Sequence, residues 1–221
     1  MHKEKLPLHQ TVISDLIRKF FKYLYHQLAF SYNWVSSIVS LGMWDDWILT
    51  TQPFLKGSKI LELGHGTGKL LLQLTKNGVN TVGIDESRQM SQIAKKQLLR
   101  NGFKPQIITA AAQYLPIKSN WFEQVVATFP SEYIIDTRTL NEVERVLQPG
   151  GELIVLPYAW ITGRSWYKRL AAWIFKITGQ APEWSNTFDG TFQLMGFDAE
   201  VHKVVLDSSE LPIITATKIK D

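Results

Sequence analysis

The fold of this chain is decided by residues 59–72, which read KILELGHGTGKLLL. An apolar run of the kind found in buried strands leads into Gly64, Gly66 and Gly68, and an amphipathic helical pattern follows. Glycine permits backbone dihedrals that are closed to other residues and leaves room for a ligand against the backbone. The helix that follows turns its free N–H groups and positive dipole end toward that ligand. The stretch therefore predicts a site for a nucleotide or a nucleoside-like molecule.

Apolar strand-like segments and helical segments alternate on both sides of this loop. Further strands are expected near residues 79–84, 105–109, 124–129, 152–156, 199–206 and 212–218. Helices are expected over 69–76, 87–100 and from Asp136 or Thr137 onward, and a sharp turn at Gln148-Pro149-Gly150-Gly151 precedes the strand at 152. Strictly alternating strands and helices predict an α/β fold with a doubly wound, mainly parallel sheet.

Two segments lie outside this alternation, and the chain is divided accordingly. Residues 1–52 form an N-terminal helical and aromatic extension, and residues 53–221 form the main domain with a basic-aromatic insertion at 158–195. Within these, residues 12–28 and 160–179 each combine an apolar helical stripe with basic residues. Each stripe fits either a helix packed on the domain or an interfacial helix on anionic lipid. If residues 160–179 form an interfacial helix, this helix is expected to be a lid that admits a lipophilic substrate.

Composition limits the class of protein. The chain has 221 residues, of which 45% are hydrophobic and 20% charged, with a formal net charge of +4 and no cysteine. These values exclude a disordered chain and an integral membrane protein, and they exclude disulfides and thiolate zinc sites. The histidines show no ligand spacing, so no metal is expected. We expect a cytoplasmic protein with peripheral contact at the inner membrane surface.

The residues around the glycines discriminate between nucleotide-like ligands. The spacing of Gly64, Gly66 and Gly68 does not match the dinucleotide pattern G-x-G-x-x-G, and Leu70 stands where a phosphate loop needs a hydroxyl. S-adenosylmethionine fits better. An acidic residue at the end of the second strand, Asp85, suits its ribose hydroxyls, and Glu62 suits its ammonium group.

Four ordered motifs carry a resemblance to class I S-adenosylmethionine-dependent methyltransferases. They are LELGHGTG at 61–68, VGIDESRQM at 82–90, YLPI with WFEQVV between 114 and 126, and RVLQPGG at 145–151. The resemblance implies a three-layer α/β/α Rossmann-like sheet of about seven strands, the last one antiparallel. It also implies S-adenosyl-L-methionine as cofactor, held by Glu62, Gly64, His65, Gly66, Gly68, Asp85, Glu86, Met90, Ala111, Ala112, Gln113 and Thr128.

The extension narrows the resemblance further. Residues 29–35 and 40–47 resemble a segment of ubiquinone/menaquinone C-methyltransferases, although Asn33 stands where those enzymes usually have aspartate. This likeness implies methyl transfer to a small, quinone-like or lipid-derived acceptor, with Tyr32 roofing the site. Further candidates for acceptor contact follow the fourth strand at Phe129, Glu132 and Tyr133. No catalytic base is identified.

Two departures keep alternatives open. Family members usually carry an acid after the third strand that bonds the adenine amino group, and Ala111 stands there instead. Gln113 offers an amide oxygen in its place, but a non-catalytic protein that binds S-adenosylmethionine remains the alternative. A nucleic-acid methyltransferase would need an Asn/Asp-Pro-Pro-aromatic motif after the fourth strand. Residues 128–131 read TFPS, so no nucleic-acid partner is expected.

Overall fold

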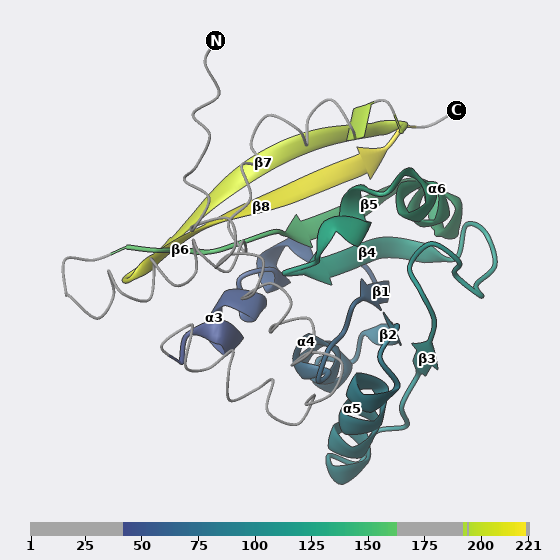
Figure 1. Cartoon of the computed structure of the whole chain (residues 1–221), viewed down its shortest axis with the longest axis vertical. Coiled ribbons are helices and arrows are strands. Elements are labelled where there is room, and N and C mark those ends of the chain that lie inside the picture. Colours follow the sequence, from purple (N-terminus) through teal and green to yellow (C-terminus); the bar gives the residue numbers. More distant parts are fainter. Residues whose placement is uncertain (1–41, 163–191, 194, 220–221) are drawn as a thin grey trace, which may run out of the picture.

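A computed structural model describes residues 42–162, 192–193 and 195–219, and a twisted sheet forms its centre (Figure 1). Five strands run parallel in the order β3-β2-β1-β4-β5. Their bounds are Lys59–Leu63 (β1), Asn80–Asp85 (β2), Ile107–Thr109 (β3), Phe122–Thr128 (β4) and Leu147–Leu156 (β5). This order places the carboxyl ends of β1, β2 and β4 together at one edge of the sheet.

Antiparallel strands complete the sheet beyond β5. The last strand, β8 (Ser209–Lys218), pairs antiparallel with β5 and with the two-residue β6 (Trp160–Ile161) along one side. Strand β7 (Phe197–Leu206) pairs antiparallel with the other side of β8. The predicted Rossmann-like sheet with an antiparallel last strand is confirmed. The described residues contain eight strands because short β6 adds to the seven that were expected.

Helices cover both faces of the sheet and form three layers with it. They are α3 (Trp44–Leu49), α4 (Lys69–Lys76), α5 (Arg88–Arg100) and α6 (Thr137–Val146), with 3-10 turns at Gln52–Phe54 (η1) and Glu132–Ile135 (η2). Leu61 and Leu63 of β1 share a buried cluster with apolar residues of α6. Ile60 belongs to a second cluster with residues of α3 and α4. Alternate residues of β1 thus point to opposite layers, as a doubly covered parallel strand requires.

Local signals set several helix boundaries as predicted. The Ser87 hydroxyl accepts a hydrogen bond from the Met90 N–H at 3.3 Å, and the Asp136 carboxylate accepts from the Arg138 N–H at 3.0 Å. Both residues are therefore N-caps, of α5 and α6 respectively.

The turn at 148–151 differs from its prediction. Strand β5 already begins at Leu147, which pairs with Phe122, and pairing resumes at Glu152 opposite Gln124 after a register shift. The turn is thus an excursion within β5. The excursion is so tight that only glycine fits at position 151, because a Cβ there would lie 2.9 Å from the carbonyl oxygens of Gln148 and Glu123.

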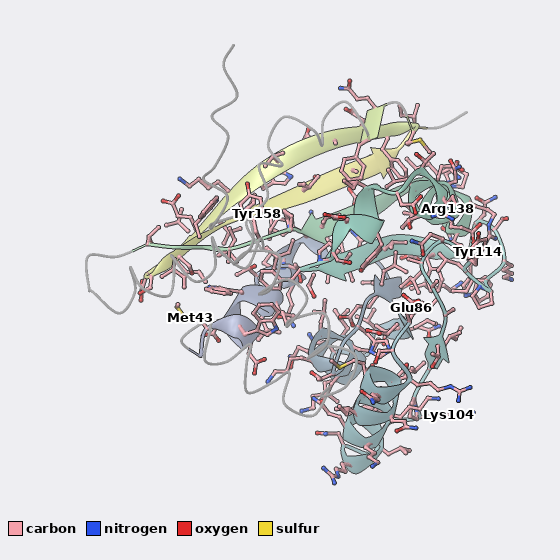
Figure 2. All side chains as sticks on the ribbon, in the orientation of Figure 1. Met43, Glu86, Lys104, Tyr114, Arg138 and Tyr158 are labelled. Carbon is pink, nitrogen blue, oxygen red and sulfur yellow. The ribbon has the colours of Figure 1, made fainter. Side chains whose placement is uncertain are left out.

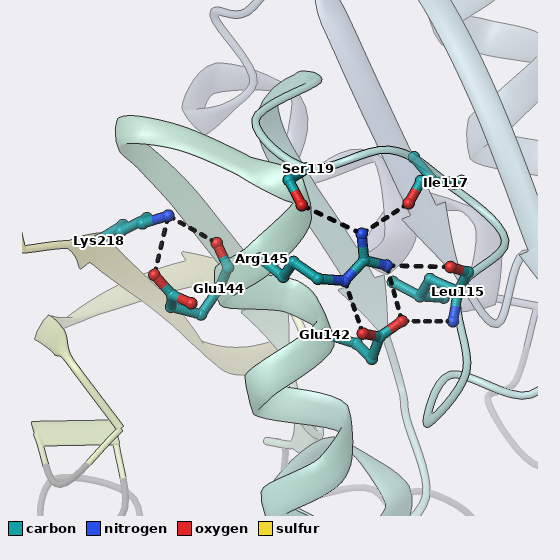
Figure 3. A network of polar contacts seen from close by, with 7 residues as sticks. All are labelled: Leu115, Ile117, Ser119, Glu142, Glu144, Arg145 and Lys218. Carbon is teal, nitrogen blue, oxygen red and sulfur yellow. Dashed lines mark hydrogen bonds and ion pairs between the residues drawn. The ribbon is translucent and has the colours of Figure 1, made fainter.

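Arg145 of α6 fastens the segment that follows β3 (Figure 3). Its guanidinium group donates to the carbonyl oxygens of Ile117 at 2.7 Å and Leu115 at 3.0 Å, and it forms an ion pair with Glu142 at 2.7 Å. Glu142 in turn accepts from the Leu115 N–H at 2.6 Å. The arginine of the RVLQPGG motif therefore positions the loop at the carboxyl end of β3.

Some predictions fall outside the described residues. These are Tyr32, the segment 12–28 and all of 160–179 beyond Thr162. The division at residue 52 also stays a prediction, although Trp47 and Ile48 of α3 are buried in the second core cluster. Among the described helices, none is long and apolar enough to cross a membrane.

Candidate functional site

The loop between β1 and α4 depends on its glycines for two reasons. Gly64, Gly66 and Gly68 have φ angles of +67°, +53° and +81°, which side chains disfavour. Two of these positions are also crowded. A Cβ on Gly64 would lie 2.5 Å from the Tyr133 hydroxyl, and one on Gly68 would lie 2.7 Å from the Ala94 Cβ. Around Gly66 there is open space, with no atom within 4 Å of its ideal Cβ. The open face of the loop is therefore at Gly66.

Asp85 joins this loop to the end of β2. One carboxylate oxygen accepts a hydrogen bond from the Gly66 N–H at 2.9 Å, and the other accepts from the Ser87 N–H at 2.8 Å. The residue is buried, and burial raises the pKa of its carboxyl group, while nearby His65 opposes that shift. Each carboxylate oxygen accommodates more than one donor, so Asp85 keeps capacity for ligand hydroxyls.

Glu62 is the most unusual group of the site. It lies on β1, only 2% exposed, and its Oε2 has no hydrogen-bond partner among the described residues. Burial raises the pKa of Glu62 to about 8, and the charge of Asp85 contributes to this shift as the second cause. The hydrogen bond from the Leu71 backbone acts in the opposite direction and lowers the pKa. A buried carboxyl oxygen without a donor is costly. A ligand cation that reached it would remove this cost.

His65 fills the space beneath the loop. The side chain is 4% exposed, and its Nδ1 lies 2.8 Å from the Gly66 carbonyl oxygen. Because a carbonyl only accepts, Nδ1 carries the proton. The ring packs on Gly83 of β2, where a Cβ would lie 2.9 Å from the His65 Cδ2. Burial lowers the pKa of the imidazole, so His65 is a neutral side chain packed between the loop and β2.

The remaining cofactor candidates surround the same edge of the sheet. Ala111, Ala112 and Gln113 follow β3 and are half-buried, and Gln113 donates its side-chain amide to Asp136 at 3.3 Å. Glu86 is exposed directly after Asp85 (Figure 2), whereas Met90 is fully buried on α5. Thr128 ends β4 next to β1. The structure thus gathers the loop, Asp85 and the ends of β3 and β4, while Met90 presents no surface.

The acceptor candidates after β4 separate into different places. Phe129 has a φ of +48° and is half-buried, and Glu132 is exposed at the start of η2. Tyr133 instead turns back to the glycine loop, where its hydroxyl donates to the Leu63 carbonyl oxygen at 3.3 Å. Tyr133 therefore contacts the predicted methyl-donor loop rather than standing apart from it.

The sequence did not predict three further residues that contact the candidate site. Trp44 stacks on Phe129 with ring centroids 4.3 Å apart, and Asp45 pairs with Lys69 at 2.6 Å. Ala94 packs against Gly68. The sequence predicted an aromatic N-terminal extension over residues 1–52, but no sequence signal identified which ring contacts which.

A depression in the described surface begins at Gln113 and extends toward α6. It measures about 670 Å³ and is lined by residues 113–116 and by Arg138, Asn141, Glu142 and Arg145 of α6. Figure 2 shows Tyr114 and Arg138 together there. Both arginines are already paired, with Asp136 and Glu142. The lining of the depression therefore offers no unpaired arginine for an anionic ligand, and it includes no residue of the glycine loop.

The comparisons with known proteins agree with this geometry. Residues 14–184 match the model of the ubiE/COQ5 methyltransferase family. The chain belongs to this family, whose members are class I S-adenosylmethionine-dependent methyltransferases.

Curated relatives are distant and longer. The chain is 28% identical over 160 residues to the ubiquinone/menaquinone biosynthesis C-methyltransferase UbiE of Coxiella burnetii, covering 68% of this chain and 64% of that protein. It is 29% identical over 143 residues to the demethylmenaquinone methyltransferase of Symbiobacterium thermophilum, covering 60% of this chain and 57% of that protein. The matches thus span less than two thirds of each relative.

Solved structures support the fold. The YcgJ protein of Bacillus subtilis superposes with a TM-score of 0.63 at 11% identity, over 80% of this chain and 99% of that one. A methyltransferase-like protein of Bacillus halodurans gives 0.60 at 14% identity, over 78% and 99%. These likenesses establish the methyltransferase fold of the chain.

Proposed function

We propose that the protein transfers a methyl group from S-adenosylmethionine to a small apolar acceptor, a quinone-like or lipid-derived ring. The observation that carries the donor half is Glu62, whose buried Oε2 lacks a partner among the described residues beside a loop that keeps open space at Gly66. Family membership supports the same cofactor.

The residues present fit that cofactor group by group. Glu62 would hold its ammonium group, and the N–H groups of the loop and of the α4 start would hold its carboxylate. Asp85 would hold the ribose hydroxyls, and the half-buried 111–113 segment would border the adenine. When bound, the sulfonium supplies an electrophilic methyl group, and the protein contributes the positioning of donor and acceptor.

The acceptor half rests on the relatives and on the acceptor candidates. Both curated relatives cited above carry quinone methyltransferase names. In this chain, Phe129 and Glu132 stand at the carboxyl end of β4, beside the donor loop, where ligands of open α/β sheets bind. Tyr32, outside the described residues, is the proposed roof.

Calorimetric titration with S-adenosylmethionine tests the donor half. The wild-type protein should bind it, and Asp85→Ala should weaken binding at least about tenfold, a loss of about 1.4 kcal/mol. Lys104→Ala, at a surface position before β3, is the matched control and should bind like the wild type. Absence of binding by the wild type would refute the proposal.

A second candidate, a non-catalytic S-adenosylmethionine-binding protein, is favoured by Ala111. An alanine in this half-buried position offers no side-chain acceptor to the adenine amino group. Loss of one such hydrogen bond costs about 1 kcal/mol of affinity. Formation of S-adenosylhomocysteine with a reduced naphthoquinone as acceptor separates the two candidates, since only the enzyme accumulates it.

We further infer peripheral membrane contact through residues 12–28 and 160–179, from their basic and apolar composition. Deletion of residues 166–177 should abolish sedimentation with anionic liposomes. Unchanged sedimentation would contradict the inference.

A further inference from the structure

The end of β4 carries an aromatic cluster whose rings differ in burial. Trp47 is fully buried, and its Nε1 donates to the Ser209 hydroxyl at 2.8 Å. Trp44 and Phe129 are only half-buried and stack on each other, with centroids 4.3 Å apart and planes at 28°. Trp47 thus anchors α3 in the core, whereas Trp44 and Phe129 are both partly exposed.

The cluster stands next to the predicted methyl-donor loop. Leu63, the last residue of β1, pairs with Ala127 of β4. Gly64 directly follows β1, Thr128 ends β4, and Phe129 comes next in the chain. A ring held against this cluster lies at the edge of the sheet where the glycine loop opens.

The backbone of Phe129 holds its ring in an unusual direction. Its φ is +48°, although an aromatic residue before proline normally adopts an extended conformation. The Phe129 N–H is fixed by the Leu156 carbonyl oxygen at 2.7 Å, and Pro130 behind it is buried. Sparsely populated backbone conformations persist where the surroundings impose them, and they cluster at ligand sites.

A second contact, besides those of the rings, connects α3 to the start of α4. Asp45, next to Trp44, pairs with Lys69 at 2.6 Å, and Lys69 is the first residue of α4 after Gly68. Helix α3 therefore contacts the residue after the glycine loop through Asp45 and contacts Phe129 through Trp44.

From this arrangement we propose that Trp44 and Phe129 form the platform on which the planar ring of the acceptor stacks, with Trp44 as the residue that selects a flat ring over a flexible chain. The inference deepens the proposed function and rests on it. An indole face attracts a flat conjugated ring through offset stacking, a preference that an alkyl chain does not share. A platform is thus a specificity device in addition to an apolar surface.

The test measures equilibrium binding of two probes, 2-methyl-1,4-naphthoquinone and dodecanoate, by dialysis. The naphthoquinone should bind the wild type, and Trp44→Ala should weaken it at least about tenfold, whereas Trp44→Phe, which keeps a stacking ring, should stay within about threefold. Dodecanoate should bind more weakly than the naphthoquinone and should respond little to either variant.

Controls separate this platform from general damage and from failure of the donor site. Trp121→Phe removes an indole near the amino end of β4, where it lies under Lys118 and Lys59, and should leave naphthoquinone binding unchanged. All variants are titrated with S-adenosylmethionine. If Trp44→Ala does not fold, comparison of Trp44→Phe with Trp44→Leu decides, because only the leucine variant should lose the naphthoquinone.

Three outcomes would overturn the platform. In the first, Trp44→Ala or Trp44→Leu binds the naphthoquinone as tightly as the wild type does. In the second, a variant loses affinity for the naphthoquinone and for dodecanoate by the same factor. In the third, the wild type binds S-adenosylmethionine but no naphthoquinone. A wild type that binds no S-adenosylmethionine contradicts the proposed function instead.

Discussion

The hydroxyl of Tyr133 lies over Gly64 and donates to the carbonyl oxygen of Leu63 at 3.3 Å. The turn after β4 is thereby tied to the loop after β1 at the point where the chain turns from strand to glycine loop. The proposed donor loop and the proposed acceptor side of the site are thus joined by a hydrogen bond.

Gly64→Ala should destabilise the protein through Tyr133 as well as through its own backbone. The left-handed φ of +67° costs an alanine about 1–2 kcal/mol, and the new Cβ would also displace the hydroxyl, which lies 2.5 Å away. In a Tyr133→Phe background only the backbone cost should remain, because the nearest ring carbon is 3.5 Å from that Cβ. Urea unfolding of the four proteins should show a coupling of about 1 kcal/mol. Gly66→Ala, with open space around it, is the control and should show no coupling to Tyr133→Phe.

Arg145→Ala should lower the free energy of unfolding by about 1–3 kcal/mol because it leaves two backbone carbonyls of the 115–117 segment without their donor. Arg145→Lys should recover little, since an ammonium group does not reproduce the planar fork that binds Glu142 and both carbonyls. Arg138→Ala on the same helix breaks an exposed ion pair with Asp136 and should change stability little. Equal effects at both arginines would contradict the role given to Arg145.

Sequence reasoning succeeded where the determinant is local. Ser87 and Asp136 cap helices because a side chain next to the helix start decides the cap, and β8 was expected from its own pattern. It failed where a distant partner decides. The pairing of Leu147 with Phe122 extends β5 through the expected turn. Tyr133, expected only as an acceptor contact, donates its hydroxyl to the Leu63 carbonyl oxygen at the glycine loop. The positive φ of Phe129 contradicts the preference of a residue before proline, so its stacking with Trp44 was not predictable.

Glu62 should make the stability of the free protein fall as pH rises. Its pKa is about 8 in the folded protein and 4.5 ordinarily, so below about pH 4.5 it is protonated in both states and contributes no difference. Between these values the unfolded chain ionises while the folded protein does not, and the free energy of unfolding decreases until about pH 8. The decrease in the free energy of unfolding between pH 4.5 and pH 9 should amount to roughly 3–5 kcal/mol. Glu62→Gln should abolish it, because glutamine does not ionise. The measurement is the difference between wild-type and variant urea curves across pH. A constant difference would refute the raised pKa.

The same carboxyl group should couple methyl-donor binding to proton release. Near pH 7 Glu62 is protonated in the free protein, and an ammonium group beside it favours the carboxylate, so binding should expel about one proton. Titration in buffers of different ionisation enthalpy measures this number as the slope of the observed enthalpy. The wild type should release about one proton more than Glu62→Gln at pH 7, and this difference should vanish near pH 9.5, where Glu62 is already ionised.

The groups around Glu62 do not supply that proton. Burial lowers the pKa of His65, so its imidazole has no second proton to lose, and the N–H groups of Gly66 and Ser87 favour the ionised form of Asp85 against the burial that raises its pKa. Glu62→Gln is the matched control, because any proton released by the ligand itself would persist in it. A slope that is equal in the wild type and in Glu62→Gln at pH 7 would show that Glu62 does not receive the ammonium group, even if the protein binds S-adenosylmethionine tightly.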